Sequence, residues 1–169
     1  MSVRTGDRLD PALFRRLAGE GLTSRASEAI LVATTDDRGR PHPALLAYGE
    51  VVALTPTRVR LTVFGASTTA RNLGARRALT LCLVGRDGVA YVKASARPLA
   101  PEPWLAAKGL AAFEAAVEDV LVDSPAPGED ASLTSGIVFA YADPERQARE
   151  SAARIEALRR AVATEADGS

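Results

Sequence analysis

The sequence predicts an α+β fold that is mainly β, with an antiparallel sheet and peripheral helices. Short apolar runs rich in β-forming residues follow one another, and turns of a few residues, such as Asp36–Gly39, separate them. Connections this short join antiparallel neighbours. Regular crossover helices between the runs are missing, which argues against a doubly wound parallel sheet. Helical patterns stand mainly at the two ends of the chain and over residues 101–122.

Length and composition predict one domain over residues 1–169. The chain is 47% hydrophobic and 25% charged, as is usual for globular domains. Lys and Arg total 21 and Asp and Glu total 21, so the basic excess typical of a nucleic-acid binder is missing. A single cysteine, Cys82, and a single histidine, His42, argue against a disulfide framework and a metal site. No signal peptide or transmembrane run is found, so we expect a soluble cytoplasmic protein with no membrane partner.

Helix signals predict four helices. An N-terminal helix over about residues 10–19 begins with Asp10 and Pro11, which suit the N-cap and first helical position. A short helix over 70–77 follows the polar run Ser67–Thr69. An inserted helix over about 101–122 is predicted from apolar residues at helical spacing, and a C-terminal helix over about 143–163 begins at Asp143-Pro144.

Strand signals predict the barrel-forming parts of the chain, over about residues 27–99 and 133–141. Residues 1–9 are expected to be a flexible start and 123–131 a surface loop. Pro41 and Pro43 indicate an irregular or edge position for the strand that contains them. The predicted strands are 29–35, 45–54, 58–64, 79–84, 89–97 and 133–141.

Several of these pieces, taken in order, resemble the pyridoxamine 5'-phosphate oxidase-like family. They are Ala29–Thr35, Asp37–His42, Leu61–Ser67, Ala70–Leu73 and Ser135–Phe139. The resemblance runs from about residue 27 to 99 and again from 135 to 144. It implies a six-stranded antiparallel split β-barrel that binds FMN, or a deazaflavin in some branches, at a homodimer interface.

The resemblance also implies that the strand, turn and helix over 61–73 hold the cofactor phosphate. Ser67, Thr68 and Thr69 supply hydroxyls at a helix start, where free N–H groups favour an anion, and Arg71 could add a charged contact. A simpler interpretation makes Ser67 an N-cap and leaves the threonines solvated. The candidate cofactor-binding residues are Thr62, Val63, Ser67, Thr68, Thr69, Arg71, Asn72 and Lys93.

Departures from the family pattern argue against a true pyridoxamine phosphate oxidase. Thr68 and Thr69 stand where those oxidases carry basic residues, and Ala44 stands where they carry an arginine. The C-terminal residues that hold their product have no counterpart. Lys93 or Arg97, on one polar strand face, could replace the lost charges, although such a face is usually solvated.

The leading hypothesis is a homodimeric FMN-binding flavoprotein that acts as an oxidoreductase on a small molecule. The flavin would carry the redox chemistry, so no catalytic acid or base is assigned. Alternatives are a split barrel that binds a deazaflavin, one that binds haem, for which His42 is a candidate ligand, and a cofactor-free dimeric scaffold. Cys82 is interpreted as a small buried hydrophobe.

Overall fold

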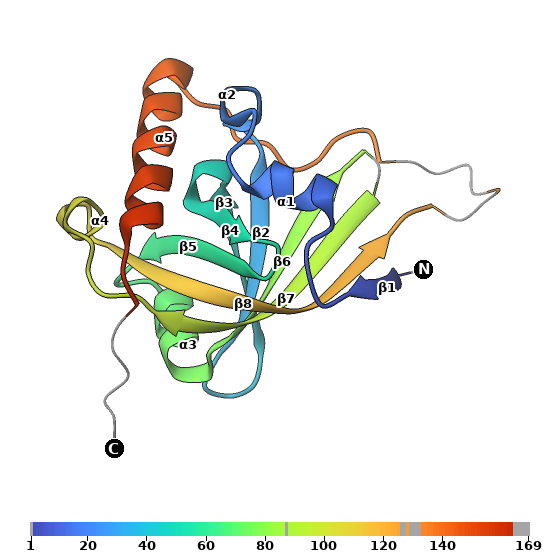
Figure 1. Cartoon of the computed structure of the whole chain (residues 1–169), viewed down its shortest axis with the longest axis horizontal. Coiled ribbons are helices and arrows are strands. Elements are labelled where there is room, and N and C mark those ends of the chain that lie inside the picture. Colours follow the sequence, from blue (N-terminus) through green and yellow to red (C-terminus); the bar gives the residue numbers. More distant parts are fainter. Residues whose placement is uncertain (1, 87, 126–127, 129–132, 164–169) are drawn as a thin grey trace.

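The computed structural model describes residues 2–86, 88–125, 128 and 133–163. Within these residues, eight strands form one antiparallel sheet with the order β3-β2-β6-β7-β8-β5-β4, and β1 also pairs with β8 (Figure 1). The strands are β1 (Ser2–Gly6), β2 (Ala29–Thr35), β3 (Pro41–Ala47), β4 (Val51–Thr55), β5 (Arg58–Phe64), β6 (Ala78–Gly85), β7 (Gly88–Pro98) and β8 (Leu110–Asp123). The helices are α1 (Pro11–Leu17), α2 (Leu22–Arg25), α3 (Thr68–Arg76), α4 (Pro103–Ala107) and α5 (Pro144–Arg160), with a 3-10 turn η1 (Tyr48–Glu50).

The mainly β antiparallel architecture is confirmed, but the predicted count of six strands is wrong. Predicted strands 29–35, 58–64, 79–84 and 89–97 correspond to β2, β5, β6 and β7. The predicted strand 45–54 is divided by η1, so its first residues end β3 and its last residues form β4. The 3-10 turn η1 interrupts the run, and its two halves reach opposite edges of the sheet.

The inserted helix predicted over 101–122 is wrong. Only Pro103–Ala107 is helical, and β8 occupies the rest. Alternating residues of β8, including Phe113, Ala115 and Val117, are buried in the core. Alanines gave this segment a helix-forming composition, but hydrogen bonding to strands on both sides decides its conformation.

Two terminal expectations are also corrected. Residues 133–141 contain no strand; they lie beside the start of β2, with one isolated bridge between Glu28 and Val138. At the start of the chain, the predicted flexible segment contains β1, which pairs with residues 120–123 of β8. The strand β1 depends on pairing with residues far along the chain, which local patterns do not report, whereas the apolar pattern over 133–141 did not give that segment a partner strand.

β8 is the centre of the sheet. One of its edges pairs with β7 along residues 113–123. The other edge pairs with β5 over residues 110–116 and with β1 over residues 120–123. Among the described strands, β8 therefore supplies the hydrogen bonds that join β4 and β5 to β7 and the remaining strands.

Two hydrophobic cores hold the helices against the curled sheet. The inner core contains Leu13 and Leu17 of α1 and Leu73 of α3, packed among side chains of the strands. A second core on the outer side joins α5 and α4 to β4 and β8 through residues such as Leu158 and Leu105. In Figure 1, α5 stands beside β4 and β5, while α1 and α3 lie toward opposite ends of β6. None of the described helices is both long and apolar enough to span a membrane.

Candidate functional site

The first turn of α3 presents free backbone donors. Ser67 is its N-cap, and the Ser67 hydroxyl accepts a hydrogen bond from the Ala70 N–H at 3.1 Å. The Ser67 N–H donates to the Phe64 carbonyl. Of the helix-start N–H groups, those of Thr68 and Thr69 have no backbone acceptor within the helix, as is normal for a first turn. The capping that the simpler interpretation predicts is therefore present together with an anion-favouring helix end.

A cavity of about 600 Å³ lies between α3 and the β2–β3 turn. From α3 it is lined by Thr68, Arg71, Asn72, Ala75 and Arg76, and from the turn by Asp36, Asp37 and Arg40. The Arg71 guanidinium is exposed and donates to the Thr68 hydroxyl at 3.0 Å. Arg76 donates to the backbone carbonyl of Asp37 at 2.7 Å, which fixes the turn against the end of the helix.

Asp36 and Arg40 form a closed unit at the rim of this cavity. The Asp36 carboxylate accepts the backbone N–H of Arg40 and its guanidinium, both at 2.8 Å, and the backbone N–H of Arg38 at 2.9 Å. The bond from the Arg40 backbone, followed by the guanidinium bond, holds the pKa of Asp36 below its ordinary value. Asp36 therefore neutralises much of the charge on Arg40, while Arg71 and Arg76 have no carboxylate in ion-pair contact among the described residues.

Asn72 ties α3 to the sheet. Its amide nitrogen donates to the Thr34 hydroxyl at 2.9 Å, and that hydroxyl donates to the carbonyl of His42 at 3.3 Å. Asn72 and Thr34 are both buried. This chain of hydrogen bonds fixes one wall of the cavity relative to β2 and β3.

The other predicted cofactor-binding residues lie in different surroundings. Thr62 and Val63 of β5 are buried in the sheet, and the Thr62 hydroxyl donates to the Ala111 carbonyl at 3.0 Å. Thr69 is also buried. Lys93 is exposed on β7 and lines a separate hollow of about 350 Å³, whose wall includes Thr34. The structure thus brings Ser67, Thr68, Arg71 and Asn72 together at α3 and sets Lys93 apart.

Four other side chains from the sequence analysis make no such cluster. Arg97 donates to Glu114 at 2.6 Å. His42 is half-buried on β3, and Cys82 is half-buried on β6, where burial raises the pKa of its thiol. Ala44 packs against the inner core. Within the described part of the chain, no group of three or more His, Cys, Asp or Glu side chains is arranged to hold a metal ion.

Sequence reasoning missed three residues at this end of the sheet. Arg40 and Arg76 enter the cavity because the β2–β3 turn folds onto α3, a contact that no local motif reports. Phe64, the last residue of β5, is 67% exposed directly before the turn that leads to Ser67. The sequence could not predict this exposure. The alternation of side chains along β5 does not show whether its last residue faces the core or the solvent.

Comparisons with known proteins support the fold. No protein-family model matches the chain. The uncharacterized protein YclD of Bacillus subtilis (strain 168) is 29% identical over 89 residues, which are 53% of this chain and 58% of YclD. The chain thus spans a little over half the length of that relative.

Solved structures similar to the chain share its fold at low sequence identity. A candidate pyridoxamine 5'-phosphate oxidase from Lactobacillus delbrueckii matches with a TM-score of 0.53 and 13% identity, over 69% of this chain and 95% of that one. An F420 reductase matches at 0.51 and 13%, over 66% and 98%. An FMN-binding protein from Syntrophomonas wolfei matches at 0.51 and 13%, over 70% and 90%. The chain therefore has the split-barrel fold of the pyridoxamine 5'-phosphate oxidase-like proteins, as its sequence resemblance predicted.

Proposed function

We propose that the chain is a flavoprotein that binds FMN non-covalently and serves as an oxidoreductase on a small molecule. The observation that carries this proposal is the cavity at α3, where helix-start donors and arginines converge. The similarity to an FMN-binding protein of the same fold favours FMN as the occupant. The fold alone would not justify the assignment, since one fold supports several functions.

The phosphate of FMN would lie at the start of α3. The N–H groups of Thr68 and Thr69 supply neutral donors, and Arg71 supplies a charged one. Arg76 lines the same cavity and adds a second positive charge. These two arginines supply positive charge that Thr68 and Thr69 lack. The threonines at those positions were the main argument from the sequence against a phosphate site.

Bound flavin supplies hydride or electron transfer, and the chain's own residues bind it, orient it and exclude water. Phe64 is exposed, and its carbonyl accepts the Ser67 N–H, so its ring is a candidate to stack on the flavin, since aromatic faces stack favourably on planar rings. Asn72 holds α3 in place through Thr34 and also lines the cavity. We assign no catalytic acid or base.

We also propose that two copies of the chain pair through the β3 edge of the sheet. β3 is an edge strand, and its Leu45 is 45% exposed. Together with Phe64, it leaves apolar surface that a second copy would cover. Sedimentation analysis tests this directly: a dimer is expected, and a strict monomer would contradict the pairing.

Flavin titration of the purified protein tests the proposed phosphate site. Wild-type protein is expected to bind FMN saturably and riboflavin much more weakly, because riboflavin has no phosphate. Arg71→Ala should weaken FMN binding about 10- to 100-fold, as expected for loss of a charge-assisted hydrogen bond. It should leave the weak riboflavin affinity unchanged.

Arg38→Ala is the matched control, because Arg38 is exposed on the β2–β3 turn, which borders the cavity, but does not line the cavity itself. Equal FMN binding by wild type and Arg71→Ala would contradict the phosphate assignment. Tighter binding of F420 or haem than of FMN would replace the cofactor assignment. Failure to bind all three would favour the cofactor-free scaffold.

A further inference from the structure

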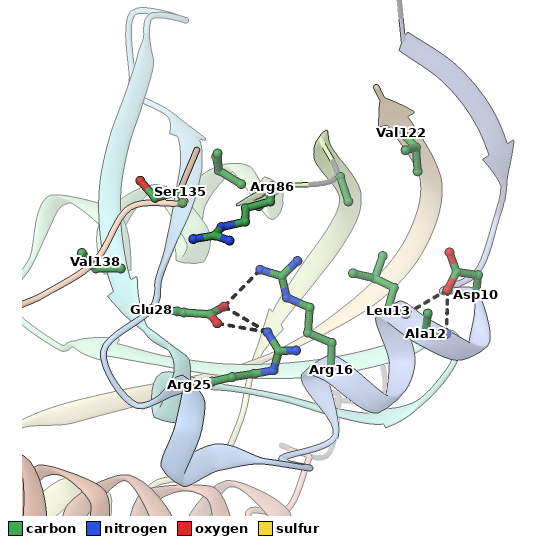
Figure 2. A pocket seen from close by; sticks show the side chains of 14 residues that line it. Asp10, Ala12, Leu13, Arg16, Arg25, Glu28, Arg86, Val122, Ser135 and Val138 are labelled. Carbon is green, nitrogen blue, oxygen red and sulfur yellow. Dashed lines mark hydrogen bonds and ion pairs between the residues drawn. The ribbon is translucent and has the colours of Figure 1, made fainter. Parts of the chain in front are cut away.

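A second cavity of about 600 Å³ lies where β2 begins and β6 ends (Figure 2), whereas the α3 cavity lies where β2 ends and β6 begins. The second cavity is bordered by α1, by the β6–β7 hairpin and by residues of segment 135–138. The two cavities have no lining residue in common. A ligand in this second cavity would therefore contact none of the residues that line the proposed FMN phosphate site.

Three arginines turn into this cavity around one carboxylate, Glu28 (Figure 2). One nitrogen of Arg25 donates to both carboxylate oxygens, at 3.0 and 3.2 Å, and Arg16 donates to one of them at 3.2 Å. Arg86 donates its Nε–H to the Thr134 carbonyl at 2.9 Å. Among the described residues, no carboxylate forms an ion pair with Arg86.

The cavity carries more positive than negative charge. Its other acid is Asp10, whose carboxylate accepts the N–H groups of Ala12 and Leu13 at 2.8 Å and caps α1. Three arginines and two carboxylates leave one net positive charge. A monovalent anion would balance this charge.

One donor in the arginine group lacks an acceptor. The Nε atom of Arg16 is buried and has no hydrogen-bond partner within the described residues. Leaving a buried donor unsatisfied is costly, and such groups usually mark a missing water or ligand. Gly85 lies directly beside this guanidinium, since a Cβ atom built there would be in van der Waals contact with Nη1 of Arg16, at 3.5 Å.

The remaining wall is apolar and is drawn from five parts of the fold. Aliphatic side chains from α1, β6, β7, β8 and segment 135–138 face the same space as the arginines. They are Leu13, Val84, Ala90, Val122 and Val138. A cavity of this size with an apolar wall and a few convergent polar groups suits a small organic molecule.

We propose that this cavity binds a monocarboxylate with an apolar body. The carboxylate would accept hydrogen bonds from Arg16 and Arg86, since a guanidinium matches the geometry of a carboxylate. The hydrocarbon part would cover the aliphatic wall, which inorganic phosphate would leave in water. The single excess positive charge would be balanced by the single negative charge of the ligand.

Substitution of Arg86 can distinguish ligand binding by the arginines from a purely structural role. Arg16 and Arg25 lie over the ring of Tyr48, at 5.6 and 5.9 Å from its centre, so both also stabilise packing. Arg86 is exposed and has no such ring contact among the described residues. Replacing it should alter the cavity's charge with little effect on folding.

Octanoate is a suitable probe, with its uncharged analogue octanamide and inorganic phosphate for comparison. Calorimetric titration of the full chain is expected to show one saturable octanoate site, with octanamide and phosphate at least tenfold weaker. Arg86→Gln should weaken octanoate binding by roughly tenfold or more, as for loss of a charged hydrogen-bond donor. Arg38→Gln, an exposed arginine outside the cavity, should leave it unchanged.

FMN titration of the same variants separates this proposal from the proposed function, because Arg86→Gln should bind FMN like wild type. The proposal is overturned by absence of saturable octanoate binding, by equal affinity for octanamide, or by unchanged octanoate affinity in Arg86→Gln. Thermal melting of each variant establishes that a loss of binding does not come from unfolding.

Discussion

Replacing Arg60 by methionine should strongly destabilise the fold, because Arg60 joins β5, β8 and α5. Its Nε donates to Glu114 at 3.0 Å. Its Nη1 donates to three carbonyls at the end of α5, those of Leu158 at 2.8 Å, Arg159 at 3.1 Å and Ala161 at 2.6 Å. Arg60 and Glu114 are only 8% and 4% exposed, so water cannot readily replace these bonds.

The expected loss in the free energy of unfolding is about 4 kcal/mol. Removing one member of a buried ion pair costs roughly 3–5 kcal/mol, because the other charge stays buried. Arg97 still contacts Glu114 and limits this loss. The orphaned carbonyls of α5 act in the opposite direction, since each unsatisfied buried acceptor costs about 1–3 kcal/mol.

Urea denaturation followed by circular dichroism measures this change. With a urea dependence of about 2 kcal/mol per molar, the midpoint should fall by about 2 M. Arg97→Met is the matched control, because the Arg97 side chain is 54% exposed and its removal leaves Glu114 paired with Arg60. A midpoint shift for Arg60→Met that is no larger than that of Arg97→Met would refute the reasoning.

The same pair gives a pH dependence. Burial opposes ionisation of Glu114, but hydrogen bonds from Arg97 and Arg60 outweigh it and hold its pKa below the ordinary value of 4.5. Its contribution to stability is therefore present above pH 4.5 and is lost as the pH falls through the lower, folded-state pKa. The difference in stability between wild type and Glu114→Gln should shrink over that acidic range.

Two further predictions concern the segment around η1. Burial raises the pKa of Tyr48 to about 12 from 10.0. The free energy of unfolding should therefore fall by about 2–3 kcal/mol between those pH values, because the tyrosine ionises first in the unfolded chain. Ultraviolet titration should show a late ionisation that Tyr48→Phe lacks, and its persistence in that variant would disprove the assignment. Gly49→Ala should cost about 1–3 kcal/mol, because the new Cβ would lie 2.8 Å from the Cα of Ser151. Gly74→Ala, in open space on α3, should instead stabilise by about 0.5–1 kcal/mol in thermal melts, and equal effects of the two alanines would contradict the packing argument.

Local patterns predicted the parts of the fold that local physics controls. β5 alternates its side chains, and α3 begins at a serine that caps it, so both were readable from a few consecutive residues. β8 was misread, because its alanines fit a helix as well as a strand. Its pairing with β5, whose partner residues lie 46 to 58 positions earlier in the chain, decides between the two. The strand β1 was missed for the same reason, since its partner is the far end of β8.

The candidate site divides in the same way. Ser67, Thr68 and Arg71 lie within one turn of sequence, so their proximity could be anticipated. Arg40 and Arg76 meet only after β2 and β3 have formed a hairpin that rests on α3. The cavity beside α1 could not be anticipated at all, because its arginines come from three separate segments, and a charge pattern in the sequence does not reveal convergence.

The position of β8 also orders events during synthesis of the chain. When residues up to Pro98 have left the ribosome, β2, β3, β6 and β7 can pair among themselves, and β4 can pair with β5, but no strand yet exists to join these two pieces. Their facing edges stay open to pairing with other chains until residues 110–123 emerge. Nascent chains arrested before residue 110 should therefore aggregate readily. Resistance to proteolysis should first appear in chains long enough for residue 123 to have left the ribosomal exit tunnel.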